Sequence, residues 1–278
     1  MKKLFFVISV FTLAVSCNKD DAAQMPVSDS KGIIITVDDS SLDVDVQTRT
    51  SPVSTLPGSL YLAGTTGTSS QTSKWSSHEV SISSGKIKTG YYQTATPTAY
   101  NYYLSNAKMT FTSSGCTVSA DGTATDVIVG VTKGSDSTTP SVTMDHVFAR
   151  TGSVTCSSAN GYSLTGLSYK LTSKGSLTGT KGTYNIYTKG WSSVTALPAT
   201  TFNESSDLYL IPGEYTLTVS GTESLGDYSK SFSASADITL VAGKVNNIAA
   251  TRTSSGAQDV TVSVSLASWG STTLSPSI

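Results

Sequence analysis

Residues 260–266 have the sequence Val260-Thr261-Val262-Ser263-Val264-Ser265-Leu266, in which apolar and small polar side chains strictly alternate. Successive side chains of a β-strand point to opposite faces, so this alternation predicts a strand with one apolar face. Residues 42–46 alternate in the same way, with Leu42, Val44 and Val46 separated by two aspartates, and a β-branched run at 33–37 precedes them.

The rest of the chain repeats this pattern in short segments between turns. Of its 278 residues only 13% are charged, and Ser, Thr, Val, Tyr and Gly take the place of helix formers. Turn-forming pairs such as Ser84-Gly85, Asn160-Gly161 and Ala242-Gly243 separate the apolar runs. Many short strands at this spacing predict an all-β protein built of β-sandwiches, leaving room only for a short helix at 50–57 or 196–202.

The length allows one large domain or two of ordinary size. A polar stretch with Gly and Pro, Lys133-Gly134-Ser135-Asp136-Ser137-Thr138-Thr139-Pro140, divides the β-rich part into halves of similar size. We therefore expect an N-terminal domain at 32–135 and a C-terminal domain at 136–278. A long hairpin loop within one domain is the alternative.

The first residues are typical of an export signal. Lys2 and Lys3 precede an apolar stretch at 4–15, which is too short to span a bilayer but suits a signal peptide. The stretch ends in Leu13-Ala14-Val15-Ser16-Cys17, which resembles the lipobox of bacterial lipoproteins except at Ala14, where Leu is commoner. This predicts a signal peptide at 1–16 and acyl chains such as palmitate on Cys17. An ordinary signal peptide followed by a fortuitous cysteine is the alternative.

Residues 17–31 are polar and are predicted to be a flexible tether. Within them, Asn18-Lys19-Asp20-Asp21 is similar to the surface-export signal of Bacteroidetes lipoproteins. Two or more acyl chains on Cys17 would anchor the chain durably in membrane lipid. The sequence therefore predicts a precursor anchored by lipid at the outer membrane and displayed on the cell surface.

Signatures of enzymes and of nucleic-acid binding are missing from the sequence. The formal net charge is −1 and no basic stripe occurs, so nucleic acid is not an expected partner. There is no G-x-S-x-G, Walker, H-E-x-x-H or dinucleotide-binding motif, so we expect no enzymatic activity and no cofactor. His146 would share a strand face with Met144 and Phe148, which favours a hydrogen-bonded core histidine over a catalytic one.

Neither the acidic residues nor the cysteines predict a metal site. Asp38-Asp39 and Asp43-x-Asp45 lack the full loop of a calcium site, which favours a solvated acidic face. There is no C-x-x-C motif and there are only two histidines. An exported protein permits a disulfide between Cys116 and Cys156, and two buried free thiols are the alternative.

One segment is rich in tyrosine and contains Tyr91, Tyr92, Tyr100, Tyr102 and Tyr103. Aromatic faces can stack on sugar rings, which would make the segment a glycan-binding surface. On a strand, however, Tyr100 and Tyr102 would share one face and Tyr103 would lie on the other. This arrangement favours packing within the sandwich.

Three groups of residues occur in a characteristic order between residues 32 and 269. The first is Thr48-Arg49-Thr50 followed by Gly58-Ser59-Leu60-Tyr61-Leu62-Ala63-Gly64. The second joins Asp126-Val127-Ile128-Val129-Gly130 to an apolar strand at 142–150 with His146 at its centre. The third is Leu210-Ile211-Pro212-Gly213, then Ile238-Thr239-Leu240-Val241-Ala242-Gly243-Lys244, and a late Trp269. Together they resemble the fimbrillin family of Bacteroidetes, the subunits of type V pili.

The resemblance implies two transthyretin-like β-sandwich domains in tandem and assembly outside the cell. In the family, a lipidated precursor reaches the surface, and a trypsin-like or Arg-specific protease removes its N-terminal segment. The vacated groove then accepts a strand from another subunit. In this chain the resemblance implies cleavage between Arg49 and Thr50, with other pilus subunits as partners and a host or bacterial surface ligand for adhesion.

The residues around Arg49 permit such a mechanism. Leu42, Val44 and Val46 could bury one face along a sheet, so cutting after Arg49 would remove a strand and open an edge to strand addition. The alternative is that Arg49 is an ordinary surface arginine at which no protease cuts. The candidate donor strand carries Val260, Val262, Val264 and Leu266. The tail at 271–278 also offers Leu274 and Ile278, although Pro276 would interrupt a ladder.

The sequence thus predicts a non-enzymatic fimbrial subunit that polymerises by strand exchange after cleavage and supports cell adhesion. Arg49 favours a shaft or tip subunit over an uncleaved anchor. The alternative is a monomeric surface lipoprotein that binds a glycan or a host protein through the tyrosine-rich segment.

Overall fold

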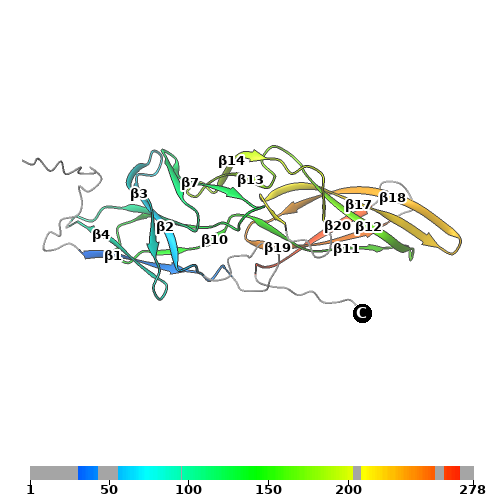
Figure 1. Cartoon of the computed structure of the whole chain (residues 1–278), viewed down its shortest axis with the longest axis horizontal. Helices are drawn as coiled ribbons and strands as arrows, with labels where there is room; N and C mark the ends of the chain where they lie inside the picture. Colours follow the sequence, from blue (N-terminus) through cyan, green and yellow to red (C-terminus); the bar gives the residue numbers. More distant parts are fainter. Residues whose placement is uncertain (1–30, 43–55, 95, 203–207, 254–259, 270–278) are drawn as a thin grey trace, which may run out of the picture.

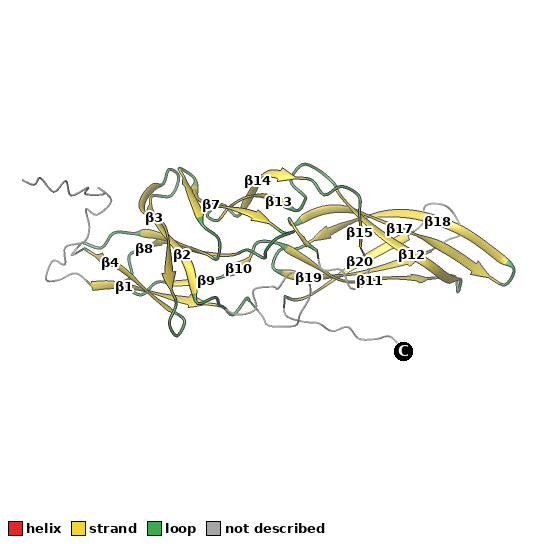
Figure 2. Cartoon of the chain, in the orientation of Figure 1, coloured by secondary structure: helices red, strands yellow, loops and turns green. Residues whose placement is uncertain are grey.

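The described part of the chain consists of strands joined by turns and loops. The computed structural model describes residues 31–42, 56–94, 96–202, 208–253 and 260–269. Within these residues there are twenty strands and no helix, which confirms the prediction of an all-β protein. The strands form five sheets in an elongated molecule (Figures 1 and 2).

A five-stranded antiparallel sheet forms the centre of the N-terminal half, with the strand order β10-β8-β5-β2-β3. Its strands are β2 (Ser59–Thr66), β3 (Thr72–Ser81), β5 (Tyr100–Ser105), β8 (Ile128–Ser135) and β10 (Asp145–His146). Most side chains of β2 and β5 are buried on both faces, so this sheet must be covered from both sides.

Two smaller sheets provide these covers. One has the order β4-β1-β9 and the other the order β14-β13-β7-β6. Their strands are β1 (Lys31–Asp38), β4 (Lys86–Gln93), β9 (Ser141–Thr143), β6 (Met109–Thr112), β7 (Gly115–Asp121), β13 (Lys181–Asn185) and β14 (Gly190–Thr195). Adjacent residues of β5 show the two covers: Tyr102 belongs to the core shared with β1, and Tyr103 belongs to the core shared with β7.

The C-terminal half is a sandwich of two four-stranded sheets, with orders β16-β11-β19-β20 and β15-β12-β17-β18. The strands are β11 (Ala149–Ser158), β12 (Ser163–Ser173), β15 (Thr200–Phe202), β16 (Tyr209–Leu210), β17 (Gly213–Leu225), β18 (Tyr228–Leu240), β19 (Lys244–Arg252) and β20 (Val260–Ser268). The two sheets enclose one apolar core that includes Val154, Leu217 and Ile248. β20 contains the alternating stretch 260–266 and pairs with β19 without a break in register.

Strand pairing crosses the predicted domain boundary at 135/136. β9 and β10, which follow this position, pair with β1 and β8, which precede it. β13 pairs with β7, although it belongs to the predicted C-terminal domain. The division into two domains at this position stays a prediction, and the pairings show that residues 141–146 and 181–195 contribute to sheets of the N-terminal half.

The turn between β3 and β4 illustrates how local sequence fixes this arrangement. Ser84 and Gly85 both have positive φ, 50° and 68°, a geometry that follows the right-handed twist of the flanking strands. Gly85 tolerates this backbone because it has no Cβ. Its carbonyl oxygen accepts a hydrogen bond of 2.8 Å from Val37 N, so the turn also holds β1.

Candidate functional site: the N-terminal strand and the adjoining cavity

β1 forms because its run Ile33-Ile34-Ile35-Thr36-Val37 consists of β-branched residues, which favour an extended backbone. Ile33, Ile35 and Val37 point into the core beneath the five-stranded sheet, and Ile35 is 0% exposed. Ile34 faces the other way and is half-buried. β1 therefore contributes the apolar inner face at the middle of its sheet.

Both backbone edges of β1 are hydrogen-bonded. The strand is antiparallel to β4 and parallel to β9. On the β9 side, Ile34 N donates to Thr138 O at 2.8 Å and Thr36 N donates to Pro140 O at 2.9 Å. In this sheet β4 and β9 are joined only through β1. Departure of β1 would therefore leave the facing backbone groups of β4 and β9 unpaired and would expose the apolar core that β1 covers.

A polar turn ends β1. The Asp38 carboxylate accepts hydrogen bonds from Ser40 N at 3.0 Å and from Thr143 Oγ1 at 3.1 Å. The bonds from Ser40, and secondarily that from Thr143, lower the pKa of Asp38 below its ordinary value. Leu42 N donates to Asp39 O at 2.8 Å, and the Leu42 side chain is buried in the same core as β1.

The residues of the predicted removable strand lie at the end of this turn and beyond it, so the position of that strand stays a prediction. Leu42 lies in the turn rather than in a strand, and Val44 and Val46 lie outside the described residues. Short Asp and Ser side chains bond to nearby backbone and so favour turns, which explains why the strand ends before Leu42. The described strand that precedes Arg49 is β1, which begins at Lys31, the last residue of the predicted tether.

Cys17, Arg49 and Thr50 lie outside the described residues. The sequence contains two further arginines, Arg150 of β11 and Arg252 of β19, and each is only 2% exposed. Arg150 Nη1 donates to the carbonyl oxygen of Trp269 at 3.0 Å, and Arg252 Nε donates to Glu223 Oε2 at 3.0 Å. Proteases cut exposed, mobile segments, so arginines buried within strands are protected from an Arg-specific protease.

The candidate donor strand is part of the C-terminal sandwich in this structure. β20 is the last strand in the order of its sheet. Val260 is buried, Val262 and Val264 are half-buried against the C-terminal core, and Leu266 is 51% exposed. β20 therefore buries less apolar surface than β1. The tail at 271–278 lies outside the described residues.

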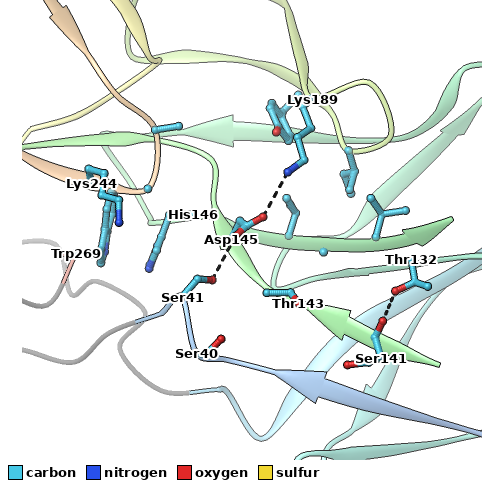
Figure 3. A pocket seen from close by; sticks show the side chains of 17 residues that line it. Ser40, Ser41, Thr132, Ser141, Thr143, Asp145, His146, Lys189, Lys244 and Trp269 are labelled. Carbon is cyan, nitrogen blue, oxygen red and sulfur yellow. Dashed lines mark hydrogen bonds and ion pairs between the residues drawn. The ribbon is translucent and has the colours of Figure 1, made fainter. Parts of the chain in front are cut away.

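A cavity of about 710 Å³ lies beside the end of β1 (Figure 3). Ser40 and Ser41 line it from the turn after β1, and Lys189 lines it from the connection between β13 and β14. In Figure 3, Ser41 and Lys189 both point toward Asp145 of β10. Ser41 Oγ lies 3.2 Å from Asp145 Oδ1 and also bonds to Met144 O, while Lys189 Nζ lies 3.5 Å from Asp145 Oδ2.

His146 also lines this cavity. Its Nδ1 is 2.7 Å from Asp126 Oδ2, and both side chains are fully buried. Its ring stacks on Trp269, with the ring centroids 4.0 Å apart and the planes 15° apart. The structure confirms the prediction of a buried, hydrogen-bonded histidine. The partners Asp126 and Trp269 were not predicted, although each belongs to one of the three groups of residues that resemble the fimbrillin family.

Four of the five tyrosines of the tyrosine-rich segment are buried or half-buried, and Tyr92 is 40% exposed. Tyr102 and Tyr103 are both 0% exposed and face opposite cores, as the strand pattern predicts. Tyr91 stacks on the buried Trp75 at a centroid distance of 4.2 Å. These contacts use the aromatic faces of Tyr91, Tyr102 and Tyr103 that a sugar would need, so they do not support glycan binding through these three rings.

The two cysteines of the described residues are free thiols in different cores. Cys116 is buried among the strands of the N-terminal half, and burial raises the pKa of its thiol to about 12. Cys156 is half-buried at the C-terminal core. Among the described residues, no group of three or more His, Cys, Asp and Glu side chains could hold a metal ion. Nor do these residues form any helix with the length and hydropathy of a bilayer span.

Comparison with solved structures identifies the fold. The fimbrilin from Porphyromonas gingivalis superimposes with a TM-score of 0.50 at 10% identity, over 86% of this chain and 98% of that one. A fimbrial protein from Bacteroides vulgatus covers 86% of this chain and 99% of its own, with a TM-score of 0.49 and 9% identity. No protein-family model matches the sequence, and no curated protein matches it. At this identity the likeness concerns architecture: the chain has the fold of that fimbrilin.

Proposed function

We propose that this chain, which has the fold of a fimbrilin, is the precursor of a fimbrial subunit that polymerises by strand exchange. In this proposal Cys17 carries the lipid that holds the precursor at the outer membrane. A protease cuts after Arg49, β1 leaves with the N-terminal segment, and a strand of another subunit takes its place. The shared fold and the residues that resemble the fimbrillin family support the proposal.

The observation that carries the proposal is the position of β1. It is the middle strand of a three-stranded sheet, yet it lies at the start of the described chain, so a single cut behind it separates it from the rest. Its departure would open a groove between β4 and β9 with the shape of one extended strand. Such a groove accepts a strand from another chain through backbone hydrogen bonds and apolar side chains.

The energetic consequence of losing β1 favours exchange over simple release. Four aliphatic side chains, Ile33, Ile35, Val37 and Leu42, are buried in one core. Burying such a side chain stabilises the fold by about 1.5–3 kcal/mol, so together they contribute about 6–12 kcal/mol. This is comparable to the whole net stability of a domain, about 5–15 kcal/mol. The N-terminal half must therefore bind a replacement strand or lose its fold.

Burial of the other two arginines supports selective processing. With Arg150 and Arg252 inside strands, an Arg-specific protease has one remaining candidate, Arg49. β20, with its alternating valines and its modest burial, and the tail that follows it are the candidate donors. A donor must present apolar side chains at every second position to replace those of β1.

Limited proteolysis tests the proposal. An Arg-specific protease should cut the folded precursor once, after Arg49, and the product should form a ladder of oligomers on an unboiled gel. Arg49→Ala should abolish both cleavage and ladder, and Arg49→Lys, which keeps the charge, should do the same with this protease. If cleavage at Arg49 leaves a stable, folded monomer that lacks β1, the proposal of polymerisation by strand exchange is wrong.

A further inference from the structure

The edges of the five sheets differ in how well they are protected against pairing with another chain. An edge strand has unpaired backbone groups, and proteins protect it by keeping it short, by charged side chains or by irregular register. Within the described residues, five of the ten edge strands have only two to four residues: β6, β9, β10, β15 and β16. β14 has an irregular register and a positive φ at Ser193. Three longer edge strands carry charges, which are Lys74 and Glu79 in β3, Lys86 and Lys88 in β4, and Lys230 and Asp237 in β18.

β20 is the remaining edge strand, and it has none of these protections. It is 9 residues long and contains no charged residue and no proline. It pairs with β19 along its whole length without a shift in register. In an antiparallel ladder alternate residues direct their N–H and C=O groups to opposite sides, so every second residue of β20 directs these groups away from β19. No strand of the described residues pairs with that side of β20, which is therefore a regular template for strand addition.

The sequence of β20 is nearly symmetrical about Val264 and therefore suits pairing with a second copy of itself. Ser263 and Ser265 flank Val264, and Val262 and Leu266 come next on either side. In an antiparallel pair about a two-fold axis at Val264, Ser263 would face Ser265 of the second copy, and Val262 would face Leu266 of the second copy. Because β20 has no charged residue, no like charges would meet across this pair.

The apolar face of β20 is only partly covered within one copy of the chain. Val262 and Val264 are half-buried against the C-terminal core, and Leu266 is 51% exposed. Pairing of two β20 strands would place Val262 of the second copy beside Leu266 and remove apolar surface from water. The exposed Ser263 and Ser265 would lie together on the opposite face, where they remain in contact with water.

We propose that two copies of the precursor associate through their β20 edges, about a two-fold axis at Val264. The pairing joins the two four-stranded sheets that contain β20 into one continuous sheet. It occupies the backbone groups of both edges, so that neither is open to uncontrolled strand addition. This dimer forms before any cleavage at Arg49 and does not depend on strand exchange.

Analytical ultracentrifugation of the intact precursor with Arg49→Ala tests the inference. The substitution removes the proposed cleavage site, so that strand exchange after cleavage cannot produce the dimer. We expect a reversible equilibrium of monomer and dimer at concentrations up to about 100 µM. A monomer throughout this range overturns the inference, and the tail at 270–278 of the same chain is then the candidate cover of the edge.

Charged variants test the register of the pairing. In a chain with Ser263→Lys and Ser265→Lys, each new lysine would face a lysine of the second copy. Two such pairs should weaken the dimer about 2-fold to 30-fold, and the same two positions changed to Glu should weaken it similarly. A mixture of the lysine and glutamate variants should form a mixed dimer that is tighter than the dimer of either variant alone. The matched control is Ser73→Lys with Ser81→Lys, which adds two lysines at exposed positions of the edge strand β3 and should leave the dimer unchanged.

Leu266→Ser tests the apolar contact. Burial of the exposed half of this side chain in both copies predicts that the substitution weakens the dimer roughly tenfold to hundredfold. If a charged variant fails to fold, Leu266→Ser decides, because its side chain contributes little to the core of one copy. If the double lysine variant or Leu266→Ser dimerises as tightly as the unaltered chain, the two copies meet elsewhere and the inference is overturned.

Discussion

Replacing Ile35 by Ala tests how firmly β1 is held once the chain behind it has been cut. Ile35 is 0% exposed and packs with Leu62, Ile87 and other residues of one core. Removing a buried Ile side chain to Ala costs about 2–5 kcal/mol, because transfer energy is lost and a cavity remains. At about 1.4 kcal/mol per factor of ten, β1 should leave the nicked protein about 30-fold to several thousand-fold more readily. Ile34→Ala is the matched control, since Ile34 is half-buried on the other face and should change release far less.

The assay follows the fragment directly. Each variant is cut with an Arg-specific protease, diluted, and passed over a size-exclusion column at successive times. Mass spectrometry then measures how much N-terminal fragment remains with the body. If Ile34→Ala and Ile35→Ala release the fragment at equal rates, the side-chain orientation described for β1 is wrong. Immediate release from the unaltered protein without any unfolding would refute the energetic argument itself.

Two further predictions concern buried groups. Glu223→Gln should lower the free energy of unfolding, measured with urea, by about 3–5 kcal/mol, because it leaves the nearly inaccessible Arg252 without its carboxylate. The hydrogen bond from Arg252 lowers the pKa of Glu223 in the folded protein. The ion pair therefore stabilises the fold above the pKa that this carboxyl has in the unfolded chain, and this stabilisation is lost as the pH falls through the pKa of the folded protein. The variant should therefore lose less stability on acidification than the unaltered chain. Alkylation at pH 8 followed by peptide mapping should modify the half-buried Cys156 before Cys116, whose pKa of about 12 leaves almost no thiolate. Equal rates at the two thiols would mean that the core around Cys116 is open in solution.

Local sequence patterns predicted the type of structure well because a strand has a period of two and a turn has characteristic residues. The alternation at 260–266 became β20, and Ser84-Gly85 became the turn before β4. What could not be predicted is which strands meet. β13 joins β7 across more than fifty residues of sequence, and nothing in either strand specifies that pairing. The covering of the central sheet on both faces follows from such long-range pairings.

In the candidate site, too, the burial of a residue could be predicted from its sequence neighbours, whereas its contacts with residues distant in the sequence could not. Apolar neighbours at alternate positions indicated that His146 is buried, whereas its partner Asp126 is twenty residues away and Trp269 is more than a hundred. The removable strand was predicted at 42–46 because alternating Val and Asp are typical of a half-buried strand, and residues 43–46 lie outside the described part of the chain. The polar run Asp38-Asp39-Ser40-Ser41 before them turns the chain, and the isoleucine run at 33–35 lies in β1.

Three consecutive residues connect the N-terminal strand with the C-terminal end of the described chain. The carbonyl oxygen of Met144 bonds to Ser41, the carboxylate of Asp145 contacts Ser41 and Lys189, and the ring of His146 stacks on Trp269. Met144 N also donates to Asp38 O at 2.9 Å. Departure of β1 with its turn would remove the contacts that hold Met144 and Asp145 on one side. The same short segment carries His146, whose ring stacks on Trp269 directly after the end of β20. The end of the N-terminal strand and the end of the last described strand therefore lie on either side of one three-residue segment.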